Sequence, residues 1–314
     1  MGRATDRNEQ MYREVTDRIL ADLKAGVMPW RKAWDDGGPI GMPSNAVTGR
    51  EYSGSNVLVL WSEALDKGYA TSEWCTFKQA MTKLGYERDG RFWNWKGGGE
   101  DPKHGVRKGE KGTPVYYFEK KVFTPKATDQ ESEPEEKGYM MARRFIVFNV
   151  DQIEGWPETE PREPRSEFEA NEAAEEFIRN VGADVRHGGG QPKYSPSADY
   201  IRLPEPERFD TTVEYYATSL HEHGHWTGHK DRLDRFGETS KTAYAFEELI
   251  AEMCAAFTCA TLGVQGKTQE SEYIGHWIEL LEDNSKVVVR AASQAAKAHR
   301  FLADLQPAKQ EVAA

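Results

Sequence analysis

The sequence predicts an α+β protein built from two domains. Its 314 residues are enough for two cores, and 38% hydrophobic and 30% charged residues are typical of a globular chain. The net charge of −11 divides into +3 over residues 1–123 and −14 over 124–314. A Pro-rich, acidic stretch at 155–167 has the composition of a linker. We therefore expect a first domain over 1–154 and a second over 168–314.

Helices and strands are mixed in the first half. The spacing of apolar residues and a closing glycine predict helices over 8–26, 55–68 and 76–85. Two strand-like runs, 114–123 and 142–150, flank an acidic segment at 124–138. We expect these runs to pair as a hairpin across that segment.

The second half has a clearer order. Apolar spacing predicts helices over 167–182, 211–228, 243–263, 273–282 and 285–305. Short strands are expected at 183–187 and at 200–203. One helix, then strands, then a row of helices is an α+β arrangement.

Membrane and secretory classes are not favoured by the sequence. The longest nearly apolar run, 253–264, is too short to cross a bilayer, and the first 15 residues lack the apolar core of a secretory signal. Cys75, Cys254 and Cys259 are odd in number and lack CxxC spacing, which is typical of reduced thiols. We therefore expect a cytoplasmic protein without a membrane partner.

Residues 220–229, LHEHGHWTGH, hold four of the eight histidines. His221 and His225 are four apart, so on a helix both rings lie on one face and can reach one ion. Glu222, next to the first ligand, is the expected general base of this HExxH pattern. The pattern predicts a divalent ion, with Zn²⁺ favoured and Mn²⁺ as the alternative.

A third ligand is expected from FEELIAEM, downstream. Glu248 and Glu252 are four apart and share one helix face. The pair resembles that of gluzincin metalloproteases, in which the first acid is a ligand and the second orients a ligating histidine. We expect Glu248 as ligand and Glu252 as the outer partner, with the roles reversible. Glu247, about 100° round the helix, is expected to face solvent.

Two further histidines are expected to stay outside the ligand set. His223 lies two residues from each ligand, on another face, and His229 follows the glycine expected to end the helix. A closed, purely structural zinc site is the alternative to an open catalytic one. The alternative is weakened because Glu222 has little structural purpose beside two ligands.

Aromatic and basic residues gather in the first half. Six of the nine tryptophans precede residue 124, several beside cations, and a Gly-rich basic turn covers 104–114. Aromatic rings that stack on bases and cations that follow phosphates are typical of single-strand binding. The candidate DNA contacts are Trp30, Arg31, Lys32, Trp34, Trp74, Lys78, Arg107, Lys108 and Lys111. The alternative is that the tryptophans form the core and the turn is a solvated hairpin.

Seven segments, in order, resemble the ArdC family of plasmid antirestriction proteins over about residues 8–305. They are MPWRKAW, NAVTGREYSGSNVLVL, WCTFKQAMTKLG, VRKGEKGTPV, FNVDQIEG, HEHGHWTGHKDRLDR and FEELIAEMCAAF. The resemblance implies an N-terminal domain that binds single-stranded DNA and a C-terminal domain with a zincin-like metalloprotease fold. It also implies protection of incoming conjugative DNA from host restriction, with His221, His225 and an acid from EELIAE as the metal site.

Three functions remain open at this point. The first is an antirestriction protein with a gluzincin-like zinc metallopeptidase site, whose protein substrate could be a restriction factor. The second is a non-catalytic shield that occupies single-stranded DNA and carries a structural metal. The third is a DNA-dependent protease that acts on DNA-bound proteins. The sequence does not decide whether the protein is an enzyme.

Overall fold

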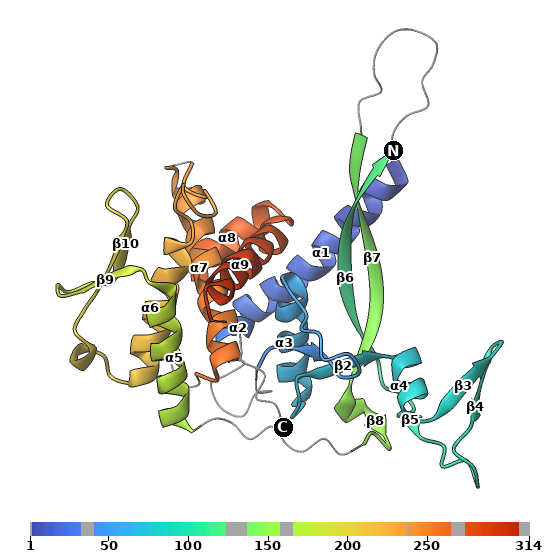
Figure 1. The fold of residues 1–314 in the computed structure, drawn as a ribbon. Helices are drawn as coiled ribbons and strands as arrows, with labels where there is room; N and C mark the ends of the chain where they lie inside the picture. The colour runs from blue at the N-terminus through green and yellow to red at the C-terminus, as the bar shows by residue number, and fades with distance from the viewer. Residues whose placement is uncertain are drawn as a thin grey trace.

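A computed structural model describes residues 2–32, 41–123, 137–157, 166–237, 239–264 and 274–307. Figure 1 shows a helical body from which two β structures project. One is the long ribbon of β6 (Thr113–Phe123) and β7 (Lys137–Asn149) beside α1 (Gly2–Lys24), and the other is the hairpin of β3 (Tyr86–Asp89) and β4 (Phe92–Trp95). The predicted α+β fold class is confirmed.

The other elements follow the predicted order. The remaining helices are α2 (Pro29–Lys32), α3 (Ser55–Lys67), α4 (Phe77–Lys83), α5 (Glu167–Val181), α6 (Thr212–Trp226), α7 (Lys241–Leu262), α8 (Ile274–Asp283) and α9 (Val287–Asp304). The remaining strands are β1 (Ser44–Asn45), β2 (Glu73–Thr76), β5 (Gly105–Val106), β8 (Ile153–Glu154), β9 (Asp184–His187), β10 (Lys193–Ser195) and β11 (Tyr200–Leu203). In the described ranges, no helix combines the length and apolarity that a membrane span needs.

Local sequence explains where the helices begin and end. α3 ends at Gly68, whose φ of 66° lies in the left-handed region that glycine adopts without strain. α4 begins at Thr76, which forms a capping box with Gln79. α1 buries Met11, Val15 and Ile19 on one face, as the apolar spacing predicts.

The first-half sheet has the strand order β1-β2-β7-β6. β6 and β7 are antiparallel, from Thr113 opposite Val147 to Phe123 opposite Lys137, so the predicted hairpin pairing is confirmed. Most of the acidic segment predicted at its tip, residues 124–136, lies outside the described residues.

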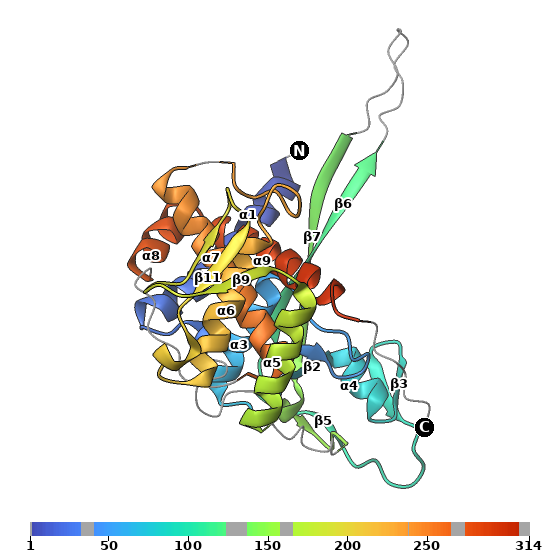
Figure 2. The same cartoon turned by 60° about the vertical axis from the view of Figure 1, so that its left-hand side comes forward.

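The second-half sheet has the order β10-β11-β9, and the views in Figures 1 and 2 place it over α6. β11 runs parallel to β9 and antiparallel to the edge strand β10. Strand β10 was not among the predicted strands, and it contributes Tyr194 to the pocket beside the candidate metal site.

The two halves share one hydrophobic core. Trp30, with none of its surface exposed, meets Trp277 of α8 edge-on at 5.9 Å between ring centroids. The ring of Trp61 lies 5.8 Å from that of Phe257 of α7 between centroids, with the two rings tilted by 53°. Residues 158–165 of the predicted linker lie outside the described residues, so the domain boundary stays a prediction.

Candidate metal centre

α6 and α7 approach closely where the site forms. A Cβ at Gly224 would lie 3.1 Å from Cα and 3.3 Å from the carbonyl oxygen of Ala251, tighter than ordinary van der Waals contact. The two small residues therefore let the helix backbones meet. This contact brings the histidine face of α6 against the acidic face of α7.

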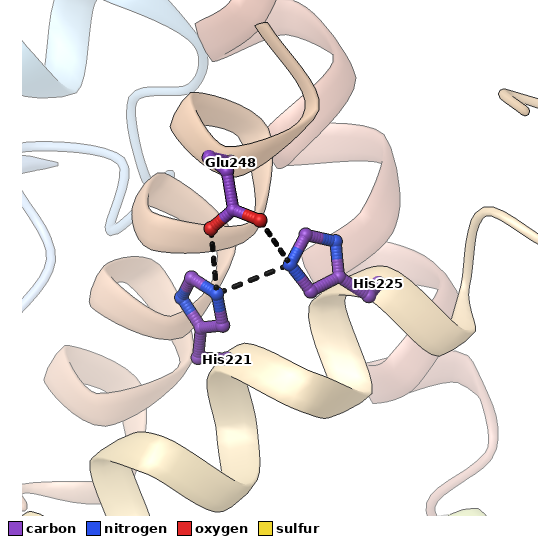
Figure 3. A group of neighbouring side chains, drawn as sticks. All are labelled: His221, His225 and Glu248. Atoms are coloured by element: carbon purple, nitrogen blue, oxygen red, sulfur yellow. Dashed lines mark hydrogen bonds and ion pairs between the residues drawn. The ribbon is translucent and has the colours of Figure 1, made fainter. Parts of the chain in front are cut away.

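The three predicted ligands converge at this contact, and Figure 3 shows their polar ends pointing toward one another. Nε2 of His221 and Nε2 of His225 are each 3.4 Å from an oxygen of Glu248 and 3.1 Å from each other. One ligand atom from each residue lies within 4.8 Å of the others. Two imidazoles and a carboxylate are the donors that suit Zn²⁺ and related ions, so the cluster fits a divalent metal.

The two other glutamates of this segment, Glu247 and Glu252, contact different histidines. Oε1 of Glu252 is 3.7 Å from Nδ1 of His221, the position expected of an outer partner. The prediction that Glu247 faces solvent is wrong, because it is 9% exposed and its Oε1 is 3.3 Å from Nδ1 of His225. The cause is Arg235, which follows α6 and covers that face of α7.

Burial sets the electrostatics of the cluster. Desolvation raises the pKa of Glu222, whose Oε2 is buried without a hydrogen-bond partner among the described residues. At Glu248 burial acts in the same direction, but hydrogen bonds with the two histidines hold its pKa well below the usual range. At His225 burial opposes protonation, and hydrogen bonds to Glu247 and Glu248 outweigh it and raise the pKa to about 10. Binding of a cation to Nε2 of His225 would therefore compete with protonation of this ring.

The other two histidines of the motif stay outside this cluster, as predicted. His223 is fully buried, its Nδ1 donates to the carbonyl of Ser219 at 2.7 Å, and burial lowers its pKa to about 4. His229 lies 3.4 Å from the carboxylate of Asp231. Neither belongs to the candidate ligand set found among the described residues.

A pocket of about 1320 Å³ opens over the cluster. The pocket is lined by Glu222 of α6, Tyr194 of β10, Phe236 of the loop after α6, Tyr244 of α7 and Arg290 of α9, among others. Three candidate ligands beside a pocket are what an open metal site requires, whereas structural sites are closed by a fourth protein ligand.

The predicted DNA contacts are only partly at the surface. Trp30 and Trp74 have no exposed surface, so neither is available to stack on a base, and both belong to the core. Trp34 lies outside the described residues, and the side chains of Arg31 and Lys32 on α2 are likewise outside them. The core alternative weighed from sequence is therefore correct for Trp30 and Trp74.

Four of the predicted basic residues do lie on the surface of the protein. Lys78, Arg107, Lys108 and Lys111 are exposed. Arg107 pairs with Glu110 at 2.8 Å, which neutralises part of the charge of the basic turn.

Sequence reasoning missed an exposed apolar surface made by Phe77, Trp93, Ile146 and Phe148, here called the aromatic surface. Phe77, 42% exposed, lies 6.2 Å from Trp93 and 6.4 Å from Phe148 between ring centroids. Gly112, next to Lys111, fits flat against Ile146 and Phe148. The sequence analysis considered tryptophans as stacking residues but not phenylalanines. The position of Phe77, directly before the predicted contact Lys78, is a signal that could have identified this surface.

Two family models match the chain. One describes the N-terminal domain of the anti-restriction factor ArdC and matches residues 9–148, and the other describes a zincin-like metallopeptidase and matches residues 172–294. Fold and site together therefore define a zincin-like domain joined to an ArdC-type N-terminal domain.

Solved structures extend this similarity to nearly the whole chain. The metal-free crystal structure of the antirestriction protein ArdC from plasmid R388 is 36% identical, covers 94% of this chain and 97% of its own, and superposes with a TM-score of 0.74. Its Mn(II)-bound structure is 35% identical, with the same coverage and a TM-score of 0.68. The chain belongs to the ArdC family of antirestriction proteins, and the resemblance found in the sequence is confirmed.

Curated relatives include uncharacterized and much longer proteins. The uncharacterized protein y4eC of Sinorhizobium fredii is 36% identical over 93% of this chain and 92% of its own length. Two DNA primases named TraC from Escherichia coli are 36% and 35% identical, but the chain spans only 19% and 27% of their lengths. The zincin-like fold and the manganese-bound relative indicate a divalent metal as cofactor.

Proposed function

We propose that this protein protects incoming conjugative DNA from restriction in the cytoplasm, by holding single-stranded DNA on its first half and using a metal-dependent hydrolytic site on its second. The observation that carries the second part is the buried Glu222 carboxylate beside the His221, His225 and Glu248 cluster. A structural metal has no use for a carboxylate with one buried oxygen left without a hydrogen-bond partner at that place, because such burial costs stability.

Each residue of the cluster has a defined role in this proposal. His221, His225 and Glu248 hold the ion, with Zn²⁺ favoured by the ligand set and Mn²⁺ as the alternative. The bound ion supplies Lewis acidity toward water and toward a carbonyl oxygen. Glu222 takes up and returns the proton at Oε2, and desolvation, which raises the pKa of this carboxyl, favours its uptake of a proton.

Single-stranded DNA is proposed to lie along the aromatic surface. Phe77 is exposed and Trp93 is partly exposed, and Lys78 beside Phe77 and Lys111 beside Gly112 are exposed cations that can meet phosphates. Stacking on aromatic rings is tolerant of sequence because every base has a flat face. This arrangement supports binding to single strands without base-specific contacts.

Phe77→Ala is expected to weaken single-stranded DNA binding by roughly 5- to 150-fold, since each stacked base contributes about 1–3 kcal/mol. Trp93→Ala is expected to have an effect of the same order. The measurement is fluorescence anisotropy with a labelled oligonucleotide without secondary structure. The control is Tyr200→Ala, which removes a ring that pairs with Arg186 on the second-half sheet. Equal affinity of Phe77→Ala and wild type would contradict this surface.

The two alternatives make different demands on the same site. A shield that acts by occupancy requires DNA binding but no proton transfer at Glu222. A DNA-dependent protease requires proteolysis that rises when single strands are added, and self-cleavage in the presence of metal and single-stranded DNA is its simplest sign. Cleavage that is lost in Glu222→Gln supports the protease. Absence of any cleavage favours the shield.

A further inference from the structure

We propose that Glu247 and Arg235 act as one positioning unit that holds His225 in the orientation required to bind the metal. The proposal deepens the metal site proposed above and rests on it. Neither residue belongs to the HExxH motif or to the pair of acids predicted from the sequence.

The carboxylate of Glu247 contacts the ring of His225. Oε1 of Glu247 lies 3.3 Å from Nδ1 of His225, while Nε2 of the same ring faces His221 and Glu248. A carboxylate at Nδ1 accepts the hydrogen there and leaves the Nε2 lone pair for the ion. Glu247 thereby selects the tautomer and the direction of the ring.

Arg235 in turn forms two hydrogen bonds with the carboxylate of Glu247. Nε donates to Oε2 at 3.0 Å and Nη2 donates to Oε1 at 2.7 Å, a two-point contact that fixes the plane of the carboxylate. Both side chains are almost completely buried, 6% exposed for Arg235 and 11% for Glu247. A buried carboxylate paired in this way has no freedom to turn away from His225.

The same arginine is also hydrogen-bonded to the C-terminal end of α6. Nη1 of Arg235 donates to Oγ1 of Thr227 at 2.8 Å, and Nη2 donates to the carbonyl of Gly224 at 2.8 Å. Gly224 lies on the last turn of α6, where carbonyls need donors from outside the helix, and Thr227 is the residue that directly follows the helix. Arg235 thus fastens the turn that carries His225 to the carboxylate on α7 that orients its ring.

Two comparisons within the molecule support a specific role. Glu252 lies 3.7 Å from Nδ1 of His221, so the outer contact of His225 is the shorter of the two. Arg232, on the same loop as Arg235, also donates to a carbonyl of the last turn of α6, that of Trp226, at 2.6 Å. The carboxylate that Arg232 holds is that of Asp199, whereas the carboxylate at Nδ1 of His225 belongs to Glu247. The loop therefore offers a matched arginine that differs from Arg235 in what it holds.

The test measures the affinity of the full-length protein for Zn²⁺ by competition with a chromogenic chelator. We expect Glu247→Ala and Arg235→Ala each to bind roughly 10- to 100-fold more weakly, the usual effect of losing a partner that orients a ligand. The double variant is expected to bind no more weakly than the weaker single variant, because the two residues act as one unit. Arg232→Ala is expected to stay within about threefold of wild type, since nothing at the ligands changes.

Conservative variants keep the test decisive if an alanine variant fails to fold. Glu247→Gln keeps an oxygen acceptor for Nδ1 and Arg235→Lys keeps a charge without the two-point contact, so both are expected to lie between wild type and alanine. Wild-type affinity in Glu247→Ala, additive losses in the double variant, or an equal loss in Arg232→Ala would each overturn the inference. A wild-type protein that binds no metal would instead overturn the proposed function itself.

Discussion

Glu248→Ala is expected to lose metal binding by more than the roughly 10- to 100-fold typical of removing an outer partner. The reason is that Glu248 supplies the only carboxylate of the candidate ligand set in the described structure, and two imidazoles alone leave the ion underligated. The buried His225 would also lose one of the three carboxylates that favour its charged form. We expect the metal-free variant to be about 3–5 kcal/mol less stable as well, the range seen when one partner of a buried pair is removed.

Metal content by mass spectrometry and chelator competition measure the first effect, and denaturant unfolding measures the second. Glu279→Ala, which removes an exposed glutamate from α8, is the control and should leave both unchanged. A Glu252→Ala variant without metal, together with a Glu248→Ala variant that keeps it, would reverse the two roles assigned to these acids.

Trp30→Ala is expected to lower the free energy of unfolding by about 3–5 kcal/mol, as for other fully buried large side chains. The ring lies in the core shared by the two halves, in edge-on contact with Trp277. We therefore expect both halves to lose stability together in one denaturant transition, even though Trp30 belongs to the first half of the sequence. Affinity for single-stranded DNA at a temperature where the variant is folded should match the wild type.

The control for this variant is Phe92→Ala. Phe92 is 75% exposed, so its removal should change the free energy of unfolding by no more than about 0.5 kcal/mol. A Trp30→Ala protein with wild-type stability and reduced DNA affinity would restore Trp30 as a DNA contact and contradict its assignment to the core.

The elements with a regular spacing of apolar or ligand residues could be predicted from the sequence. Helical spacing placed α1, α3 and the helices of the second half, and the HExxH spacing placed His221 and His225 on one face of α6. These features are local, since each depends on residues within one or two turns of one another. The pairing of β6 with β7 was also accessible, because alternating strand patterns flank a single turn-like segment.

The features that depend on tertiary neighbours were not accessible in the same way. Glu247 was expected in solvent because its helix face was judged without Arg235, which reaches it from the loop after α6. Trp30 was a candidate DNA contact because basic residues neighbour it in the sequence. Its contact with Trp277, which is far away along the chain, is not visible in the sequence. Periodicity identifies which residues share a face, but not which other element covers that face.

Protection from restriction is expected to depend on an open metal site in the second half, with Glu222 as its base. This dependence is measured by the protection of transferred DNA in a restricting recipient, with wild type compared with Glu222→Gln. Metal content and single-stranded DNA affinity are measured in both proteins. We expect protection to fall to the level seen without the protein, while metal and DNA binding persist. Unchanged protection by a metal-loaded Glu222→Gln variant would contradict the claim and leave the metal as an architectural element beside a DNA-binding shield.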